Sequence, residues 1–168
     1  MLGYGTVGSG VVEILRENAE LIEKRAGEKI QVKSVLDLRD FPGDPVQDII
    51  VHDFEEIRND SEVQIVVETM GGLHPAYEFV KASLESGKSV CTSNKALVAA
   101  YGPELLKLAE EKNVNFLFEA SVGGGIPIIR PLKVSLAPDE ILGISGILNG
   151  TTNYILTKME KEGASFSD

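Results

Sequence analysis

The chain has 168 residues, of which 43% are hydrophobic and 25% are charged, and its formal net charge is −10. This composition is typical of a globular protein of one domain or slightly more, and the single cysteine excludes an internal disulfide framework or a cysteine-built zinc site. The acidic excess disfavours a nucleic-acid partner. The sequence shows neither an apolar run near the ~20 residues of a membrane span nor a signal-like start, so we expect a cytoplasmic protein without a membrane partner.

The predicted elements of the first half begin with a helix. Apolar residues recur about once per helical turn from Val7 to Ile22, and Gly27 ends this pattern. Residues 30–36 and 63–67 form two apolar, β-branched runs that are typical of strands buried on both faces of a parallel sheet. Residues 38–48, which contain two prolines, are predicted to form a surface loop.

The second half continues the alternation of strands and helices. A helix is predicted to begin at Pro75 and end at Gly87, and another is predicted to begin at Pro103. Short apolar runs at 89–92 and 114–118 are predicted strands. This order predicts an α/β fold, with a Rossmann-like doubly wound parallel sheet.

The pattern changes after Phe118. Gly123, Gly124 and Gly125 form a hinge-like stretch, followed by a predicted strand at 141–148 and a predicted helix at 152–161. We place a domain boundary near residue 125, so that 1–125 is one domain. Because about 40 residues are too few to fold well alone, we interpret 126–168 as the incomplete beginning of a second, α+β domain.

A G-x-G-x-x-G motif opens the first predicted helix. It consists of Gly3, Tyr4, Gly5, Thr6, Val7 and Gly8. Such a turn brings backbone N–H groups and the positive end of a helix dipole to the pyrophosphate of a dinucleotide. Only Met1 and Leu2 precede the motif, so the strand that it requires is either cut short or begins further upstream.

Two charged residues follow the 30–36 run. Asp37 stands where an acidic residue binds the ribose 2′-hydroxyl of NAD, and Arg39 stands where a cation meets the 2′-phosphate of NADP. The sequence supports both interpretations, and it therefore predicts NAD or NADP as the cofactor.

Four further stretches lie where predicted strands end, and each is polar or rich in glycine. They are Glu68–Gly72, Thr92–Leu97, Glu119–Pro127 and Gly146–Leu156. Ligands of open α/β sheets bind at the carboxyl ends of the strands, so we expect these stretches to form a site. With "SNKALVA", "EASVGGGIPII" and "GILNGTTNYIL" in this order, essentially the whole chain resembles homoserine dehydrogenase.

The resemblance implies an oxidoreductase that interconverts L-homoserine and L-aspartate 4-semialdehyde with NAD(P), in the biosynthesis of threonine, methionine and isoleucine. It implies that 1–125 binds the dinucleotide and that 126–168 begins a domain for substrate binding and dimerisation, in a homodimer or higher homo-oligomer. It also implies that Lys95 is catalytic and lies near the cofactor, together with Thr69 and Gly71. A lysine can carry the proton that such a reaction takes from, or gives to, the substrate oxygen.

The resemblance also supplies two further sets of residues. A monovalent cation, usually sodium, is expected at Glu119, Val122, Gly124 and Ile126, mostly through backbone carbonyls. The substrate is expected to lie against Asn149, Gly150 and Thr151.

Several alternatives stay open. From the residues alone, a surface lysine in the turn after a strand is the simpler interpretation of Lys95. The whole chain could instead belong to another Rossmann amino-acid dehydrogenase or to a non-catalytic module that binds NAD(P). The family's substrate carboxylates and a second catalytic lysine follow the "NGTTNYIL" helix, beyond Asp168, so we expect the 168-residue chain to be an inactive fragment on its own.

Overall fold

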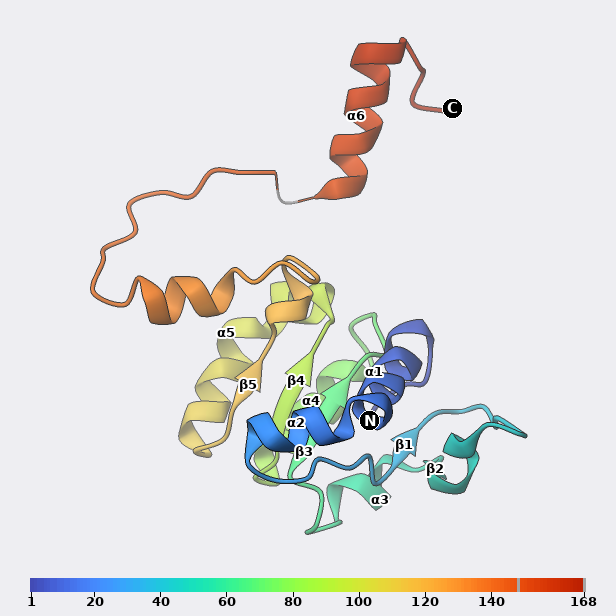
Figure 1. The fold of residues 1–168 in the computed structure, drawn as a ribbon. Helices are drawn as coiled ribbons and strands as arrows, with labels where there is room; N and C mark the ends of the chain where they lie inside the picture. The colour runs from blue at the N-terminus through green and yellow to red at the C-terminus, as the bar shows by residue number, and fades with distance from the viewer. Residues whose placement is uncertain (148, 168) are drawn as a thin grey trace. The chain divides into compact units, whose positions relative to one another are not determined.

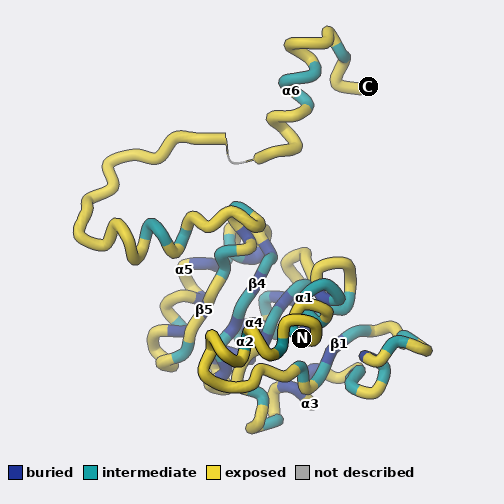
Figure 2. Tube along the Cα trace, viewed as in Figure 1, coloured by how far each residue is buried: buried dark blue, intermediate teal, exposed yellow. Residues whose placement is uncertain are grey.

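The computed structural model describes residues 1–147 and 149–167, and these form two compact units, Met1–Ile126 and Pro127–Asp168 (Figure 1). Buried side chains are concentrated in the first unit, whereas the chain after residue 126 is mostly exposed (Figure 2). No helix within the described residues is both long and apolar enough to cross a membrane.

The first unit is built on a parallel sheet. Strands β1 and β2 pair in parallel, as do β3, β4 and β5 in that order. Leu2 joins the two groups, because it forms parallel bridges with Leu36 on one side and with Glu68 on the other. The resulting order, β2-β1-Leu2-β3-β4-β5, confirms the predicted Rossmann-like fold. The strands are β1 Val35–Leu36, β2 Ile50–Val51, β3 Ile65–Glu68, β4 Ser89–Thr92 and β5 Phe116–Leu117.

Helices complete the first unit around this sheet. Helices α4 and α5 lie side by side against β3, β4 and β5 (Figure 1). The core between them is apolar and fully buried at Val66, Leu84 and Leu97, as expected when both faces of a parallel sheet are covered. The helices are α1 Thr6–Glu17, α2 Ala19–Ala26, α3 Phe54–Arg58, α4 Ala76–Glu85 and α5 Lys95–Glu111.

Two predicted helices have different bounds in the structure. The helix predicted from Val7 to Gly27 is interrupted at Asn18, which ends α1 and begins α2. Pro103 does not begin a helix but lies inside α5. That helix begins eight residues earlier because the Asn94 side chain caps it, accepting a hydrogen bond from the Leu97 N–H at 3.1 Å.

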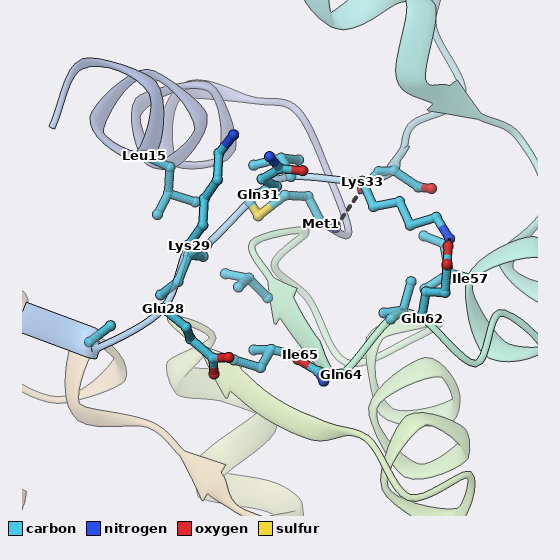
Figure 3. Close-up of a pocket in the computed structure, with 16 residues that line it drawn as sticks. Met1, Leu15, Glu28, Lys29, Gln31, Lys33, Ile57, Glu62, Gln64 and Ile65 are labelled. Atoms are coloured by element: carbon cyan, nitrogen blue, oxygen red, sulfur yellow. Dashed lines mark hydrogen bonds and ion pairs between the residues drawn. The ribbon is translucent and has the colours of Figure 1, made fainter. Parts of the chain in front are cut away.

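The strand predicted at 30–36 is also shorter than expected. Only Val35 and Leu36 are paired, and residues 28–33 make no backbone–backbone hydrogen bond to any described residue. A pocket of about 220 Å³ lies beside this segment, between it and residues 62–67 (Figure 3). It adjoins the amino ends of β1 and β3, the opposite end of the sheet from the glycine-rich motif, and it therefore plays no part in the site described below.

The predicted surface loop at 38–48 contains more regular structure than expected. A 3₁₀ helix covers Pro45–Ile49, capped by Asp44, whose carboxylate accepts a hydrogen bond from the Val46 N–H at 2.9 Å. The short elements β2 and α3 follow it, and the sequence did not reveal them, since two and five residues are too few to show a period.

The second unit contains a π-helical turn at Pro131–Ser135 and helix α6, Gly150–Glu162. Helix α6 covers the predicted helix at 152–161. The strand predicted at 141–148 is wrong for residues 141–147, which are irregular and exposed, and Leu148 lies outside the described residues. An apolar run becomes a strand only with a neighbour for its N–H and C=O groups, and the described part of this unit offers none.

Candidate functional site

The glycine motif forms a tight turn between Leu2 and α1. Gly3 has a φ of +92°, which side-chain-bearing residues rarely adopt. A Cβ on Gly8 would lie 2.2 Å from the Gly3 carbonyl oxygen and 2.9 Å from Thr69 Oγ1. The helix can therefore pack this closely on the sheet only with glycine at position 8. A Cβ on Gly5, by contrast, would meet no atom within 4 Å, so the space in front of this glycine is open.

This turn presents hydrogen-bond donors to that open space. The first backbone bond of α1 runs from the Ser9 N–H to the Gly5 carbonyl at 2.9 Å. Within the described residues the N–H groups of Thr6, Val7 and Gly8 have no acceptor, as is usual for the first turn of a helix. Three free donors at the positive end of a helix dipole are an arrangement that binds phosphate.

Asp37 and Arg39 lie next to this turn and pair with each other. Asp37 Oδ1 accepts hydrogen bonds from the Arg39 N–H and Nε, each at 3.0 Å, and Oδ2 accepts from Arg39 Nη2 at 3.0 Å and from the Tyr4 N–H at 2.9 Å. The hydrogen bond from the Arg39 side chain holds the pKa of the Asp37 carboxyl well below its usual range. The carboxylate therefore stays charged and connects the glycine turn to the end of β1.

A pocket of about 490 Å³ opens at this point. It lies at the carboxyl ends of the central strands, where ligands of open α/β sheets bind. Three of the predicted cofactor residues outside the G-x-G-x-x-G motif, Asp37, Arg39 and Thr69, line it. The sequence analysis missed the apolar walls, which come from separate elements. The lining residues include Gly3, Tyr4, Gly5, Leu38, Phe54, Met70, Pro75 and Phe79.

Lys95 is the first residue of α5, and its side chain is exposed. It does not line the 490 Å³ pocket, so the structure does not bring it together with the cofactor residues in one cavity. It is nevertheless close in the fold to the turn that contains Gly71, because the neighbouring Asn94 donates from Nδ2 to the Gly72 carbonyl at 2.6 Å. Lys95 thus follows β4, and β3 lies between that strand and Leu2, which precedes the glycine turn.

The loop after β5 is held by two short-range backbone hydrogen bonds. The Val122 N–H donates to the Glu119 carbonyl at 3.2 Å, and the Ile126 N–H donates to the Gly123 carbonyl at 3.0 Å. A Cβ on Gly123 would lie 2.4 Å from the Ile126 carbonyl oxygen. A carbonyl oxygen has two lone pairs and is a ligand type that suits a hard monovalent cation. No group of three His, Cys, Asp or Glu side chains that could hold a metal occurs in the described part of the chain.

The predicted substrate residues belong to the second unit. Asn149 caps α6, accepting a hydrogen bond from the Thr152 N–H on Oδ1 at 2.8 Å, and Gly150 and Thr151 are the first residues of that helix. All three are exposed. The cap gives Asn149 a structural role of its own, which the sequence motif did not reveal.

Comparison with known proteins adds to this geometry. Residues 3–119 match the family described as "Homoserine dehydrogenase, NAD binding domain", and residues 127–168 match the family "Homoserine dehydrogenase". The chain belongs to the homoserine dehydrogenase family. The predicted resemblance is therefore confirmed, and the first matched range contains the whole glycine motif and the Asp37–Arg39 pair.

Individual relatives agree with this membership. A homoserine dehydrogenase from Synechocystis is 45% identical over 171 residues, which cover 100% of this chain and 39% of that protein. The crystal structure of a homoserine dehydrogenase from Thiobacillus denitrificans is 42% identical, with a TM-score of 0.89 over 99% of this chain and 39% of that chain. A hyperthermophilic archaeal homoserine dehydrogenase in complex with NADPH is 31% identical, with a TM-score of 0.83 over 99% of this chain and 57% of that one. The chain thus spans 39% of the length of three curated relatives that it matches, all of them homoserine dehydrogenases.

Proposed function

We propose that this chain is the cofactor-binding part of an enzyme that interconverts L-homoserine and L-aspartate 4-semialdehyde with NAD(P), in the synthesis of aspartate-derived amino acids. Residues 1–125 bind the dinucleotide, and 126–168 begin the substrate-binding and dimerisation domain of a homo-oligomer. The matched ranges 3–119 and 127–168 support this division. The observation that carries the proposal is the open space at Gly5, faced by three free N–H donors and flanked by Asp37 and Arg39.

The chain's own residues have separable tasks in this proposal. The N–H groups of Thr6, Val7 and Gly8 bind the pyrophosphate, and the loop at 69–72 lies along the nicotinamide half. The bound cofactor supplies the hydride chemistry. Lys95 exchanges a proton with the substrate oxygen, since an alcohol must lose its proton on oxidation and an aldehyde oxygen must gain one on reduction. Asn149, Gly150 and Thr151 hold the substrate.

The Asp37–Arg39 pair favours NADP over NAD. A carboxylate has about four acceptor sites, and Asp37 already accepts four hydrogen bonds, one from Tyr4 and three from Arg39. A ribose 2′-hydroxyl would have to displace one of them. The Arg39 side chain, in contrast, is 61% exposed and can receive a 2′-phosphate without leaving Asp37. The NADPH present in the archaeal relative supports this preference.

Arg39→Gln tests the cofactor preference. We expect the Kd of NADPH to rise about tenfold, the effect of losing one charge-assisted contact, while the Kd of NADH changes less than twofold. Binding to the 168-residue chain is measured through the fluorescence of the reduced nicotinamide. Equal losses for both nucleotides would show that Arg39 acts through the fold of the turn and does not read the 2′-phosphate.

Lys95→Ala tests the reaction. In a form of the protein that turns over homoserine, we expect kcat/KM to fall at least about 100-fold, the low end for a proton-transfer group. The Kd of NADPH should stay within a few-fold of wild type. Lys112→Ala is the matched control, because Lys112 lies at the other end of α5 and should leave kcat/KM unchanged. A loss under threefold in Lys95→Ala would return Lys95 to the role of a surface lysine.

A further inference from the structure

Glu68, the last residue of β3, is a fully buried carboxylate. Its Oε1 accepts hydrogen bonds from the Met70 N–H at 2.8 Å and from the Gly71 N–H at 3.2 Å. Burying a carboxylate is costly unless its oxygens are hydrogen-bonded. The two bonds to one oxygen therefore fix the turn that follows β3, which contributes Thr69 and Met70 to the pocket wall.

The other oxygen of Glu68 reaches the neighbouring strand. Glu68 Oε2 accepts a hydrogen bond from Thr92 Oγ1 at 2.5 Å, and the same Thr92 oxygen accepts from the Asn94 N–H at 2.9 Å. Asn94 then donates from Nδ2 to the Gly72 carbonyl at 2.6 Å. Since Gly71 also donates to Glu68, the contacts form a closed ring from the end of β3 to the end of β4 and back.

The ring connects the two parts of the site that share no cavity. On one side is the turn at 69–72, and on the other is Asn94, which caps α5 directly before Lys95. Thr92 and Asn94 are 1% and 5% exposed, so water does not compete for their bonds. Building on the proposed function, we propose that Glu68 is a positioning residue, which acts through Thr92 and Asn94 to hold the 69–72 turn and Lys95 at a fixed separation around the nicotinamide end of the cofactor.

The chemistry of the ring predicts what Glu68→Gln does. Glutamine has the same shape but replaces one acceptor oxygen with an NH₂ donor. With its oxygen toward Met70 and Gly71, that NH₂ group faces the Thr92 hydroxyl, whose proton then loses its acceptor. The fold is kept, because the carboxamide fills the same space. The charge-assisted bond between the two strand ends is replaced by a weaker, neutral contact from the NH₂ group to the remaining lone pair of the Thr92 oxygen.

The test compares two ligands on the 168-residue chain. NADPH carries the nicotinamide, and 2′-phospho-ADP-ribose is the same molecule without it. In Glu68→Gln we expect the Kd of NADPH to rise about tenfold, near the low end of what one lost charge-assisted bond costs, with the Kd of 2′-phospho-ADP-ribose unchanged. A merely structural role would weaken both ligands together.

Three variants complete the experiment. Thr92→Val keeps the shape but removes the hydroxyl, and it should reproduce the selective loss of NADPH affinity. Thr92→Ser keeps the hydroxyl and should bind both ligands as wild type does. Ser83→Ala removes an equally buried hydroxyl whose bond, to the Phe79 carbonyl at 2.7 Å, stays within α4, and it should change neither affinity.

The outcomes separate this proposal from the one on which it rests. An equal loss of affinity for both ligands would overturn the positioning role. So would wild-type affinity for NADPH in either variant, Glu68→Gln or Thr92→Val. If Glu68→Gln does not fold, the pair Thr92→Val and Thr92→Ser decides the question alone. A wild-type chain that binds neither ligand would refute dinucleotide binding itself, and with it the role of Glu68.

Discussion

Two glycine-rich turns of the first unit invite comparison, because both follow a paired segment of the sheet and both contain a glycine whose position leaves no room for a Cβ. In the turn at 3–8 the first helical turn faces outward, with N–H groups that have no acceptor in the described chain. In the turn at 119–126 the N–H groups of Val122 and Ile126 are already used within the loop, and a Cβ on Gly123 would lie 2.4 Å from the Ile126 carbonyl oxygen. Free N–H groups at the start of a helix favour an anion, whereas we propose a cation for the turn at 119–126.

The difference lies in which end of the peptide group faces the ligand, and glycine content alone does not reveal it. The turn at 3–8 leads into a helix of 12 residues, whose dipole adds to the effect of its free N–H groups. The turn at 119–126 contains only the three-residue 3₁₀ segment Glu119–Ser121, which adds no comparable dipole. Each prediction below alters one of these two turns or a group that holds it in place.

The largest effect is expected from a side chain at Gly5. In Gly5→Val the side chain enters the space in front of the free donors, and we expect dinucleotide binding to be abolished while the chain stays folded, since the new Cβ meets no protein atom within 4 Å. Binding is measured by NADPH fluorescence and folding by circular dichroism. Gly10→Val is the matched control, because its Cβ also meets open space but lies one helical turn further along α1.

Gly8→Ala gives the opposite pattern. Its Cβ would lie 2.2 Å from the Gly3 carbonyl, so we expect it to lower the free energy of unfolding by about 3 kcal/mol, at the upper end for overpacking. Wild-type stability in Gly8→Ala, or intact binding in folded Gly5→Val, would contradict the division of tasks between the two glycines.

A smaller effect is expected from the carboxylate that holds Tyr4. Asp37→Asn should lower the free energy of unfolding by about 2 kcal/mol at pH 7, within the range for hydrogen bonds to a charged group. Arg39 lowers the pKa of Asp37 in the folded chain. The stabilisation that the Asp37 carboxylate contributes is therefore complete above its unfolded pKa, near 3.8, and is lost as the pH falls through its folded pKa. The difference between wild type and variant in urea unfolding should therefore shrink below about pH 3.8. A difference that is the same at pH 7 and pH 3 would show that charge is not its source.

The smallest effect concerns the cation. Replacing tetramethylammonium by sodium at constant ionic strength should stabilise the chain by about 1.4 kcal/mol when sodium is at ten times its Kd. Gly123→Ala should remove this difference, because its Cβ would displace the Ile126 carbonyl. Gly125→Ala is the control, since its Cβ meets no atom within 4 Å. A sodium effect that survives in Gly123→Ala would place the ion elsewhere.

The sequence predicted those features that depend on short stretches of chain. The glycine motif, the strand at 89–92 and the helix at 152–161 all contain their own signals. The strand at 141–147 was predicted wrongly because strand formation depends on a partner, which an apolar run does not contain. Pro103 was misread because the cap at Asn94, nine residues before the start it suggested, decides where α5 begins. The role of Glu68 was out of reach, since it depends on a contact with Thr92, 24 residues away.

The bridge at Leu2 has a consequence for motion. Every backbone hydrogen bond between the β1–β2 half and the β3–β5 half of the described sheet passes through Met1, Leu2 or Gly3. A dinucleotide bound as proposed would contact Arg39 on one half and the 69–72 turn on the other, and so would hold the two halves together. Separation of the two halves at residues 1–3 is then a sub-global unfolding event. The Leu36 amide, which donates to Met1, should therefore exchange with deuterium more slowly once the nucleotide is bound.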